Sequence, residues 1–191
     1  NDISPSEDPE NRTVVTPARA EGTVFDSDRT IHVTTRGEIT RTQPTDIPDL
    51  VDQVPGAFNQ RTNRAAGAPV LRGFVGPGNL LLIDGVRLNT SIFRTGPNQY
   101  ASLTDPLGLD HVEVVLGPGS VLYGSNAMGG VLHSITRSVP DRDGWSGTVL
   151  SRLASADRAT EGSVHLAGRG GSVMGWVGGS VRRHDELRVG C

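Results

Sequence analysis

Residues 109–136 read LDHVEVVLGPGSVLYGSNAMGGVLHSIT, and this stretch decides the fold. Residues 109–116 alternate between apolar and polar side chains, which is the period of a half-buried β-strand. The Gly-Pro-Gly sequence at 117–119 predicts a tight turn, because glycine permits backbone angles that other residues avoid. A short helical turn is expected over 120–123. The glycine pair at 129–130 then bends the chain into a second strand.

Two short helices are predicted before this stretch. Thr35 and Glu38 have the spacing of a capping box, so a helix is expected to begin there. Asp46 can cap a second helix. The apolar residues of this second helix recur at i, i+3, i+4 and i+7 and share one face. They are Ile47, Leu50, Val51 and Val54.

Several upstream segments have strand character. Residues 80–83 form a continuous apolar run, which is typical of a central strand. The Asp-Gly pair that follows this run predicts a turn. The other segments are 30–34, 57–60, 69–74 and 86–88. We therefore expect an α+β domain with a small, mixed, four-stranded sheet and short helices.

The chain changes character after residue 137. Three segments have the length of a tilted membrane-crossing strand, which is roughly 9 to 11 residues. They are 145–154, 159–168 and 173–183. In the second segment, apolar or glycine positions alternate with polar ones, which is the pattern of a transmembrane β-barrel. A soluble antiparallel meander would give the same alternation, so the pattern by itself leaves both architectures open.

Composition excludes several classes of function. The net charge is −3 and all 18 basic residues are arginine, so the chain has no basic surface of the kind that binds nucleic acid. The single cysteine, Cys191, can form neither an internal disulfide nor a cysteine-based metal site. No run of about 18 apolar residues is present, which excludes a membrane-spanning helix.

No catalytic or nucleotide-binding motif is found. Gly117 and Gly119 follow a predicted strand, but Leu122 occupies the position of the third glycine of a dinucleotide-binding loop. The chain has no lysine for a phosphate-binding P-loop, and Ser120 lacks the flanking glycines of a nucleophile elbow. The five histidines are scattered singly. We therefore expect no enzymatic activity, no metal site and no cofactor.

Four motifs together resemble the plug domain of TonB-dependent outer-membrane receptors. They are Val54-Pro-Gly56, Val70-Leu-Arg-Gly73, Leu80-Leu-Leu-Ile-Asp-Gly85 and the strand-turn-strand block at 109–136. Their order and spacing match that family over residues 12–137. One departure occurs at Leu116, where the family has an arginine before the glycine-proline pair.

The resemblance implies three regions. Residues 1–29 are expected to be a disordered periplasmic tail, residues 30–138 the plug domain, and residues 139–191 the start of a transmembrane β-barrel. The plug would face the periplasm and the barrel lumen, in the cell outer membrane. Three strands cannot close a barrel that needs about 22, and open edges leave backbone groups unpaired in lipid. We expect either a fragment of a longer receptor or a truncated product. The latter would be inert or a non-transporting periplasmic interaction protein.

The tail contains a short segment similar to a TonB box, formed by Thr13, Val14, Val15 and Thr16. In the family, this segment pairs as an added strand with TonB, which ExbB and ExbD energise. Backbone hydrogen bonds supply the affinity of such strand addition. The alternative is an ordinary edge strand of the plug.

The resemblance also implies a ligand and the residues that meet it. An intact receptor takes up a scarce small molecule such as a ferric siderophore, haem or cobalamin. The candidate apical loops are 61–67 and 89–100. Within them, the residues that can meet an anionic or polar ligand are Arg64, Arg94, Asn98 and Tyr100. The alternative for each is a solvated loop residue.

Arg72 and Glu113 are the candidates for locking the plug to the barrel. Arg72 lies at a predicted strand end, so we expect its guanidinium to be partly buried and paired. In the family, this arginine and the one at the position of Leu116 face glutamates on barrel strands. With Leu116 in place, Glu113 is expected to pair with Arg72 inside the plug. The alternative is that Glu113 faces solvent.

Overall fold

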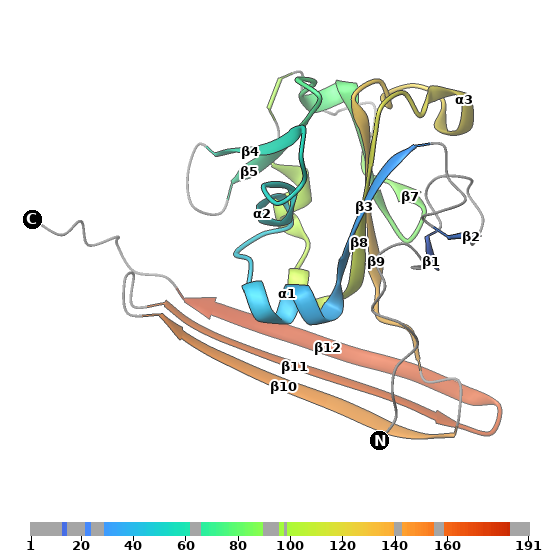
Figure 1. Cartoon of the computed structure of the whole chain (residues 1–191). Helices are drawn as coiled ribbons and strands as arrows, with labels where there is room; N and C mark the ends of the chain where they lie inside the picture. The colour runs from blue at the N-terminus through green and yellow to red at the C-terminus, as the bar shows by residue number, and fades with distance from the viewer. Residues whose placement is uncertain are drawn as a thin grey trace, which may run out of the picture. The chain divides into compact units, whose positions relative to one another are not determined.

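The computed structural model describes residues 13–14, 22–23, 29–61, 66–89, 96–97, 99–139, 143–154 and 159–183. The chain divides into two compact units, Asn1–Thr136 and Arg137–Cys191. Each unit is described by itself (Figure 1). Among the described residues, no helix has both the length and the apolar character needed to cross a membrane.

The first unit is built on a mixed sheet with the strand order β3-β8-β9-β6-β7 (Figure 1). These strands are β3 (Thr30–Thr35), β6 (Asn79–Ile83), β7 (Val86–Arg87), β8 (Leu109–Leu116) and β9 (Gly130–Thr136). Neighbours are antiparallel except β6 and β9, which are parallel. The predicted mixed sheet is confirmed. It has five strands rather than four, because the chain turns back immediately after β6 and pairs β7 with it.

Strands β4 (Ala57–Arg61) and β5 (Gly67–Leu71) pair only with each other, as a separate two-stranded sheet. The strand predicted over 69–74 ends at Leu71, because Arg72 and Gly73 both have positive φ and reverse the chain. A hydrogen bond from the amide of Phe74 to the carbonyl of Leu71 closes this turn at 2.9 Å. The φ of Arg72 is 49°, a conformation that non-glycine residues adopt infrequently.

The helices are short and mostly begin where the sequence predicts. Helix α1 (Arg36–Thr42) starts with the capping box, in which the Thr35 amide donates to Glu38 Oε2 at 2.7 Å. Helix α2 (Pro48–Val51) has Ile47 as its cap residue. Helix α3 (Ser120–Tyr123) is the predicted helical turn. The described part of this unit also contains the 3₁₀ helices η2 (Gly76–Gly78), η3 (Tyr100–Leu103) and η4 (Pro106–Gly108).

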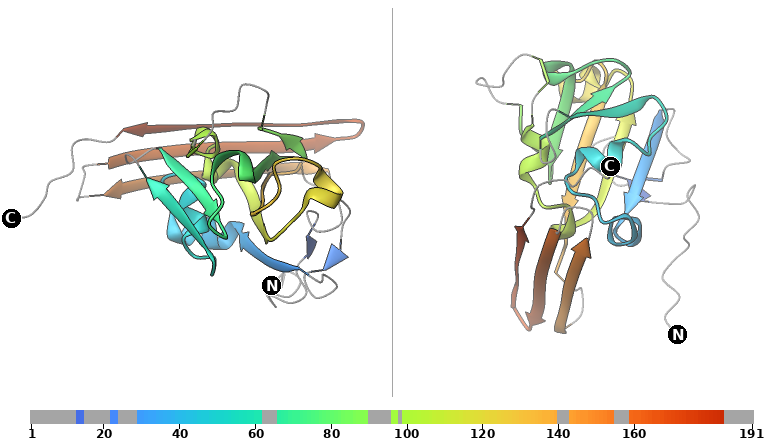
Figure 2. Two further views of the ribbon diagram at one scale, coloured as in Figure 1. Left: turned by 90° about the horizontal axis from the view of Figure 1, so that it is seen from above. Right: turned by 90° about the vertical axis from the view of Figure 1, so that its left-hand side faces the viewer.

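Both faces of the main sheet are buried, which strand alternation alone does not reveal. Figures 1 and 2 show α1, α2 and the β4–β5 hairpin on one side of this sheet. The larger core cluster lies on that side; it includes Ile39, Leu50, Val51, Leu71, Leu81, Val112, Val114, Leu116 and Leu132. A smaller cluster contains Leu80, Leu82, Val115, Ala127 and Val131, with Tyr123 of α3 packed against it.

The second unit is an antiparallel sheet in the order β10-β11-β12. Its strands are β10 (Gly144–Ala154), β11 (Ala159–Gly170) and β12 (Val173–Arg183). The register places Val149 beside Val164, and Leu166 beside Val177, so these side chains share one face. Glu161 and His165 lie on the opposite face, where Arg152 Nη1 is 3.6 Å from Glu161 Oε1 and His165 stacks on Trp176.

Candidate functional site

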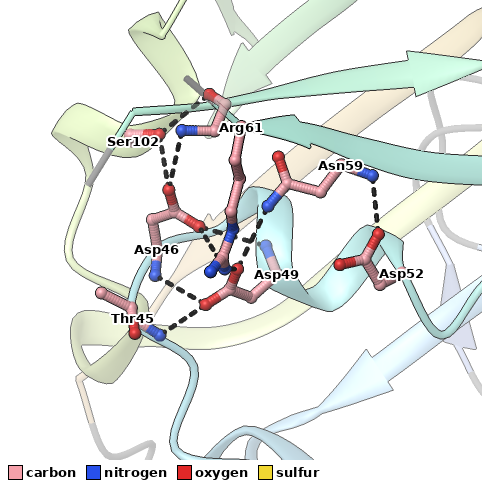
Figure 3. Close-up of polar contacts among 8 residues, drawn as sticks. Thr45, Asp46, Asp49, Asp52, Asn59, Arg61 and Ser102 are labelled. Carbon is pink, nitrogen blue, oxygen red and sulfur yellow. Dashed lines mark hydrogen bonds and ion pairs between the residues drawn. The ribbon is translucent and has the colours of Figure 1, made fainter. Parts of the chain in front are cut away.

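A polar cluster joins the ends of the two candidate apical loops (Figure 3). Asp46 lies just before α2, and Asp49 lies within it. Arg61 ends β4, Gly67 begins β5, and Ser102 belongs to η3. The cluster therefore brings together residues on both sides of loop 61–67 and the residue just after loop 89–100.

Asp46 is the centre of this cluster, and its side chain is almost fully buried, at 2% exposure. Its Oδ2 accepts hydrogen bonds from the Gly67 amide at 3.1 Å and from the Ser102 hydroxyl at 2.8 Å. Its Oδ1 accepts from the Asp49 amide at 3.2 Å. Asp46 thus supplies an acceptor to the first turn of α2, although Ile47 rather than Asp46 is the cap residue. A buried carboxylate needs several such donors, because burial removes its hydration.

Asp49 holds the other side of the cluster. Its carboxylate forms an ion pair with Arg61, and Arg61 Nη2 is also 3.8 Å from Asp46 Oδ1. Asp49 Oδ1 accepts from Asn59 Nδ2 at 3.1 Å, and Asp49 Oδ2 accepts from the Thr45 amide at 2.8 Å (Figure 3). One guanidinium thus faces two carboxylates, and strand β4 is fixed to α2.

Local sequence patterns do not predict this cluster. They predict Asp46 only as a helix cap, because its partners Gly67 and Ser102 are 21 and 56 positions away along the chain. No feature of the sequence indicated that both loops would end on the same carboxylate.

The predicted ligand-facing residues are only partly described. Arg64, Arg94 and Asn98 lie outside the described residues. Tyr100 begins η3 and is partly buried, packed against the larger core cluster. At the start of the second loop, Asn89 is buried: its Oδ1 accepts from the Leu81 amide and its Nδ2 donates to the Asn79 carbonyl, both at 2.8 Å.

The structure contradicts the predicted pairing of Arg72 with Glu113. Arg72 is exposed, and its only described polar contact is from its amide to the Gly56 carbonyl at 2.9 Å. Glu113 is fully buried, at 0% exposure, so the solvent-facing alternative is also wrong. The fold separates the two residues. Leu71, next to Arg72, lies in the larger core cluster together with Val112 and Val114 of β8. Glu113 alternates with these two valines along the strand, so its side chain points to the opposite face of the sheet. The locking roles of Arg72 and Glu113 toward a barrel stay a prediction.

Glu113 belongs to a group of titratable residues on the central strands. His111 Nε2 is 3.3 Å from Glu113 Oε1, and His111 Nδ1 is 2.9 Å from Asp110 Oδ2. Burial opposes protonation of His111, but these two carboxylates outweigh it and raise its pKa to about 9. His133, which pairs with Glu113 across β8 and β9, accepts from the Gly85 amide through Nε2 at 2.9 Å. Burial lowers the pKa of His133 despite the nearby Glu113 and Asp84.

The raised pKa of His111 predicts a pH-dependent stability. A histidine whose pKa rises on folding stabilises the native state below its ordinary pKa of 6.5, and this contribution is lost as the pH rises toward 9. We expect the free energy of unfolding to fall by roughly 2 kcal/mol over this interval, and His111→Gln to remove the fall. Because the pKa of His133 is lowered, its titration affects the free energy of unfolding only below pH 6.5.

Urea titrations of the purified chain at pH 6.5 and pH 9 test this expectation. Both tryptophans, Trp145 and Trp176, lie in the second unit, so hydrogen exchange of β8 amides is the appropriate probe. Equal pH dependence in the wild type and in His111→Gln would show that His111 does not carry the effect.

The candidate TonB box is described over two residues. Thr13–Val14 form strand β1, which pairs antiparallel with β2 (Gly22–Thr23). Val15 and Thr16 lie outside the described residues. The first half of the segment is therefore extended, which is the conformation that strand addition requires.

Comparison with known proteins identifies relatives over most of the chain. The family model "TonB-dependent Receptor Plug Domain" matches residues 23–131. The chain is 34% identical to the vitamin B12 transporter BtuB of Vibrio vulnificus over 87% of its own length and 27% of that protein. It is 33% identical to a hemin receptor of Yersinia enterocolitica over 92% of its own length and 26% of that protein.

Solved structures support the same fold. The pyoverdine outer-membrane receptor FpvA of Pseudomonas aeruginosa superimposes with a TM-score of 0.76 at 21% identity, over 92% of this chain and 26% of the receptor. The chain thus spans about a quarter of the length of these proteins. The relatives are receptors and transporters rather than enzymes, as the sequence predicts. The match over 23–131 and the identity to the curated relatives show that the chain belongs to the plug-domain family of TonB-dependent outer-membrane receptors.

Proposed function

We propose that the chain is the plug and the first barrel strands of an outer-membrane transporter that takes up a scarce chelate with energy supplied through TonB. The observation that carries this proposal is the succession of two units. The first is a plug-type mixed sheet. The second is an antiparallel sheet with strands of 11, 12 and 11 residues.

The side chains of the second unit support a membrane-facing role. Large apolar residues are exposed on one face of its sheet: Trp145, Val149, Leu153, Val164, Leu166, Val173, Val177 and Val181. A soluble protein seldom exposes a continuous apolar surface of this kind. The opposite face is mixed, because it carries Arg152, Glu161 and His165 together with Met174 and Trp176. Its charged residues suit the polar interior of a barrel. This division favours the barrel over the soluble meander.

The proposed ligand is a compact metal chelate or haem-type molecule. The relatives are named for vitamin B12 and hemin, and the structural neighbour was solved with pyoverdine. Arg64, Arg94, Asn98 and Tyr100 are the proposed contacts, since arginine and amide side chains suit an anionic or polar chelate. The ligand is cargo, and no chemistry is done on it.

The proposed mechanism is thermodynamic coupling between two sites. The ligand binds outside at loops 61–67 and 89–100, and TonB binds the segment Thr13–Thr16 in the periplasm; ExbB and ExbD energise TonB. Both events bias the same two states of the plug, so each changes the affinity of the other by the same factor. Arg72 is retained as a proposed contact to the barrel, because its exposed side chain is free to reach a glutamate there.

Two experiments test the proposal. Sequencing the gene beyond codon 191 should reveal about 400 or more further residues of alternating strands; an immediate stop codon would favour a non-transporting plug-like protein. The complete gene product should bind one of cyanocobalamin, hemin, ferric pyoverdine and ferric enterobactin in a titration of the purified receptor. Failure to bind any of the four would contradict the proposed ligand class.

A further inference from the structure

We infer that Asp46 is a positioning residue that couples the two ligand-facing loops of the plug, an inference that rests on the proposed function. Its carboxylate does not need to touch the ligand. It holds the last residue of loop 61–67 and the serine that follows loop 89–100, so a displacement of either loop is transmitted to the other.

One carboxylate oxygen of Asp46 accepts hydrogen bonds from the ends of both loops. Asp46 Oδ2 accepts from the Gly67 amide at 3.1 Å and from Ser102 Oγ at 2.8 Å. Ser102 Oγ is also 3.0 Å from the Gly67 carbonyl oxygen. The Ser102 hydroxyl has one proton, which it shares between these two acceptors. Moving Gly67 therefore changes both contacts of Ser102.

Gly67 is also closely packed, with no space for a side chain. A Cβ atom at this position would lie 2.8 Å from Pro48 Cβ and 2.5 Å from Asn59 Oδ1. Pro48 begins α2, and Asn59 is bonded to Asp49. The backbone at Gly67 is thus packed directly against α2 and β4, and close-packed elements transmit displacement instead of absorbing it.

The polar cluster is also attached to the hydrophobic core through α2. Leu50 and Val51 of α2 are buried, at 1% and 0% exposure, in the larger core cluster. Arg61 at the start of the first loop is paired with Asp49, and Asn89 at the start of the second is bonded to β6. All four loop ends are held, and Asp46 and Ser102 together connect the end of the first loop to the end of the second. A carboxylate in a buried site makes stronger hydrogen bonds than one in water, which gives this link its stiffness.

The test uses Ser102→Ala in the complete receptor, because this change removes both contacts of the Ser102 hydroxyl, to Asp46 Oδ2 and to the Gly67 carbonyl, and leaves the carboxylate in place. Ser102→Thr keeps the hydroxyl and should restore wild-type behaviour. Ser120→Ala is the matched control: Ser120 also donates through Oγ, to the Ala127 carbonyl at 3.4 Å, but it lies in α3 outside both loops.

Two readouts separate coupling from a local structural effect. Hydrogen exchange of the Gly67 amide, followed by mass spectrometry on the unliganded receptor, should accelerate by about fivefold in Ser102→Ala, the equivalent of one ordinary hydrogen bond. The dissociation constant of whichever probe binds, among cyanocobalamin, hemin, ferric pyoverdine and ferric enterobactin, should rise by a similar factor. Neither value should change in Ser102→Thr or Ser120→Ala.

The results that overturn the inference are distinct from those that overturn the proposed function. If Ser102→Ala accelerates exchange only near residue 102 and leaves Gly67 unchanged, the loops are not coupled through the contacts of Asp46 and Ser102. Unaltered probe affinity in Ser102→Ala has the same meaning. If the wild-type receptor binds none of the four probes, the ligand class is wrong, and the exchange at Gly67 still decides whether the coupling exists.

Discussion

Val15→Pro will weaken capture of the chain by the C-terminal domain of TonB at least tenfold. Val15 directly follows strand β1, Thr13–Val14, in the candidate TonB box. Strand addition depends on backbone hydrogen bonds, and proline has no N–H to donate. We expect at least a tenfold loss of affinity, because one lost donor and the fixed φ of proline both disfavour pairing; about 1.4 kcal/mol is sufficient for that factor.

A pull-down with purified TonB domain measures this effect directly. Glu7→Pro is the matched control, since it introduces the same residue into the same tail, outside the box. Capture of Glu7→Pro should equal that of the wild type. If Val15→Pro is captured as well as Glu7→Pro, Thr13–Thr16 is not the segment that TonB binds.

Gly130→Ala will destabilise the first unit by about 3 kcal/mol or more, which is at the high end for overpacking. Gly130 begins β9 between β8 and β6, in the centre of the sheet. A Cβ atom there would lie 2.4 Å from the Val115 carbonyl oxygen and 2.9 Å from Leu71 Cδ1. The carbonyl is part of the backbone of β8, so no rotation of a side chain relieves the clash.

Hydrogen exchange of β8 and β9 amides across a urea series gives the required free energy. Gly108→Ala is the control, because a Cβ atom at Gly108 meets nothing within 4 Å. Its stability should stay within about 0.5 kcal/mol of the wild type. Equal stability of the two variants would contradict the packing of β9 against β8.

Local signals explain most of what the sequence predicted correctly. The capping box of Thr35 and Glu38 acts over three residues, and the apolar run at 80–83 identifies a strand covered on both faces. Glu113 shows where this reasoning fails. Alternation along β8 predicts that one face meets solvent, but the whole of 112–116 is buried, because segments distant in sequence cover both faces of the sheet.

The candidate site was harder to predict than the fold for the same physical reason. The positive φ of Arg72 ends β5 at Leu71, before the predicted end of the strand at residue 74, and leaves the Arg72 side chain exposed. The partners of Asp46 come from β5 and η3, which only the tertiary fold brings together. A capping position could be predicted, and its long-range role could not.

Ligand uptake by cells with and without TonB tests the central claim most directly. The complete gene is expressed in the outer membrane of a transport-deficient strain, and accumulation of cyanocobalamin, hemin, ferric pyoverdine and ferric enterobactin is measured. We predict that one of these ligands accumulates in cells with TonB and is only bound at the surface of cells without it, and that Val15→Pro reproduces the second behaviour. Accumulation that is equal with and without TonB, or absent for every ligand, would contradict the account.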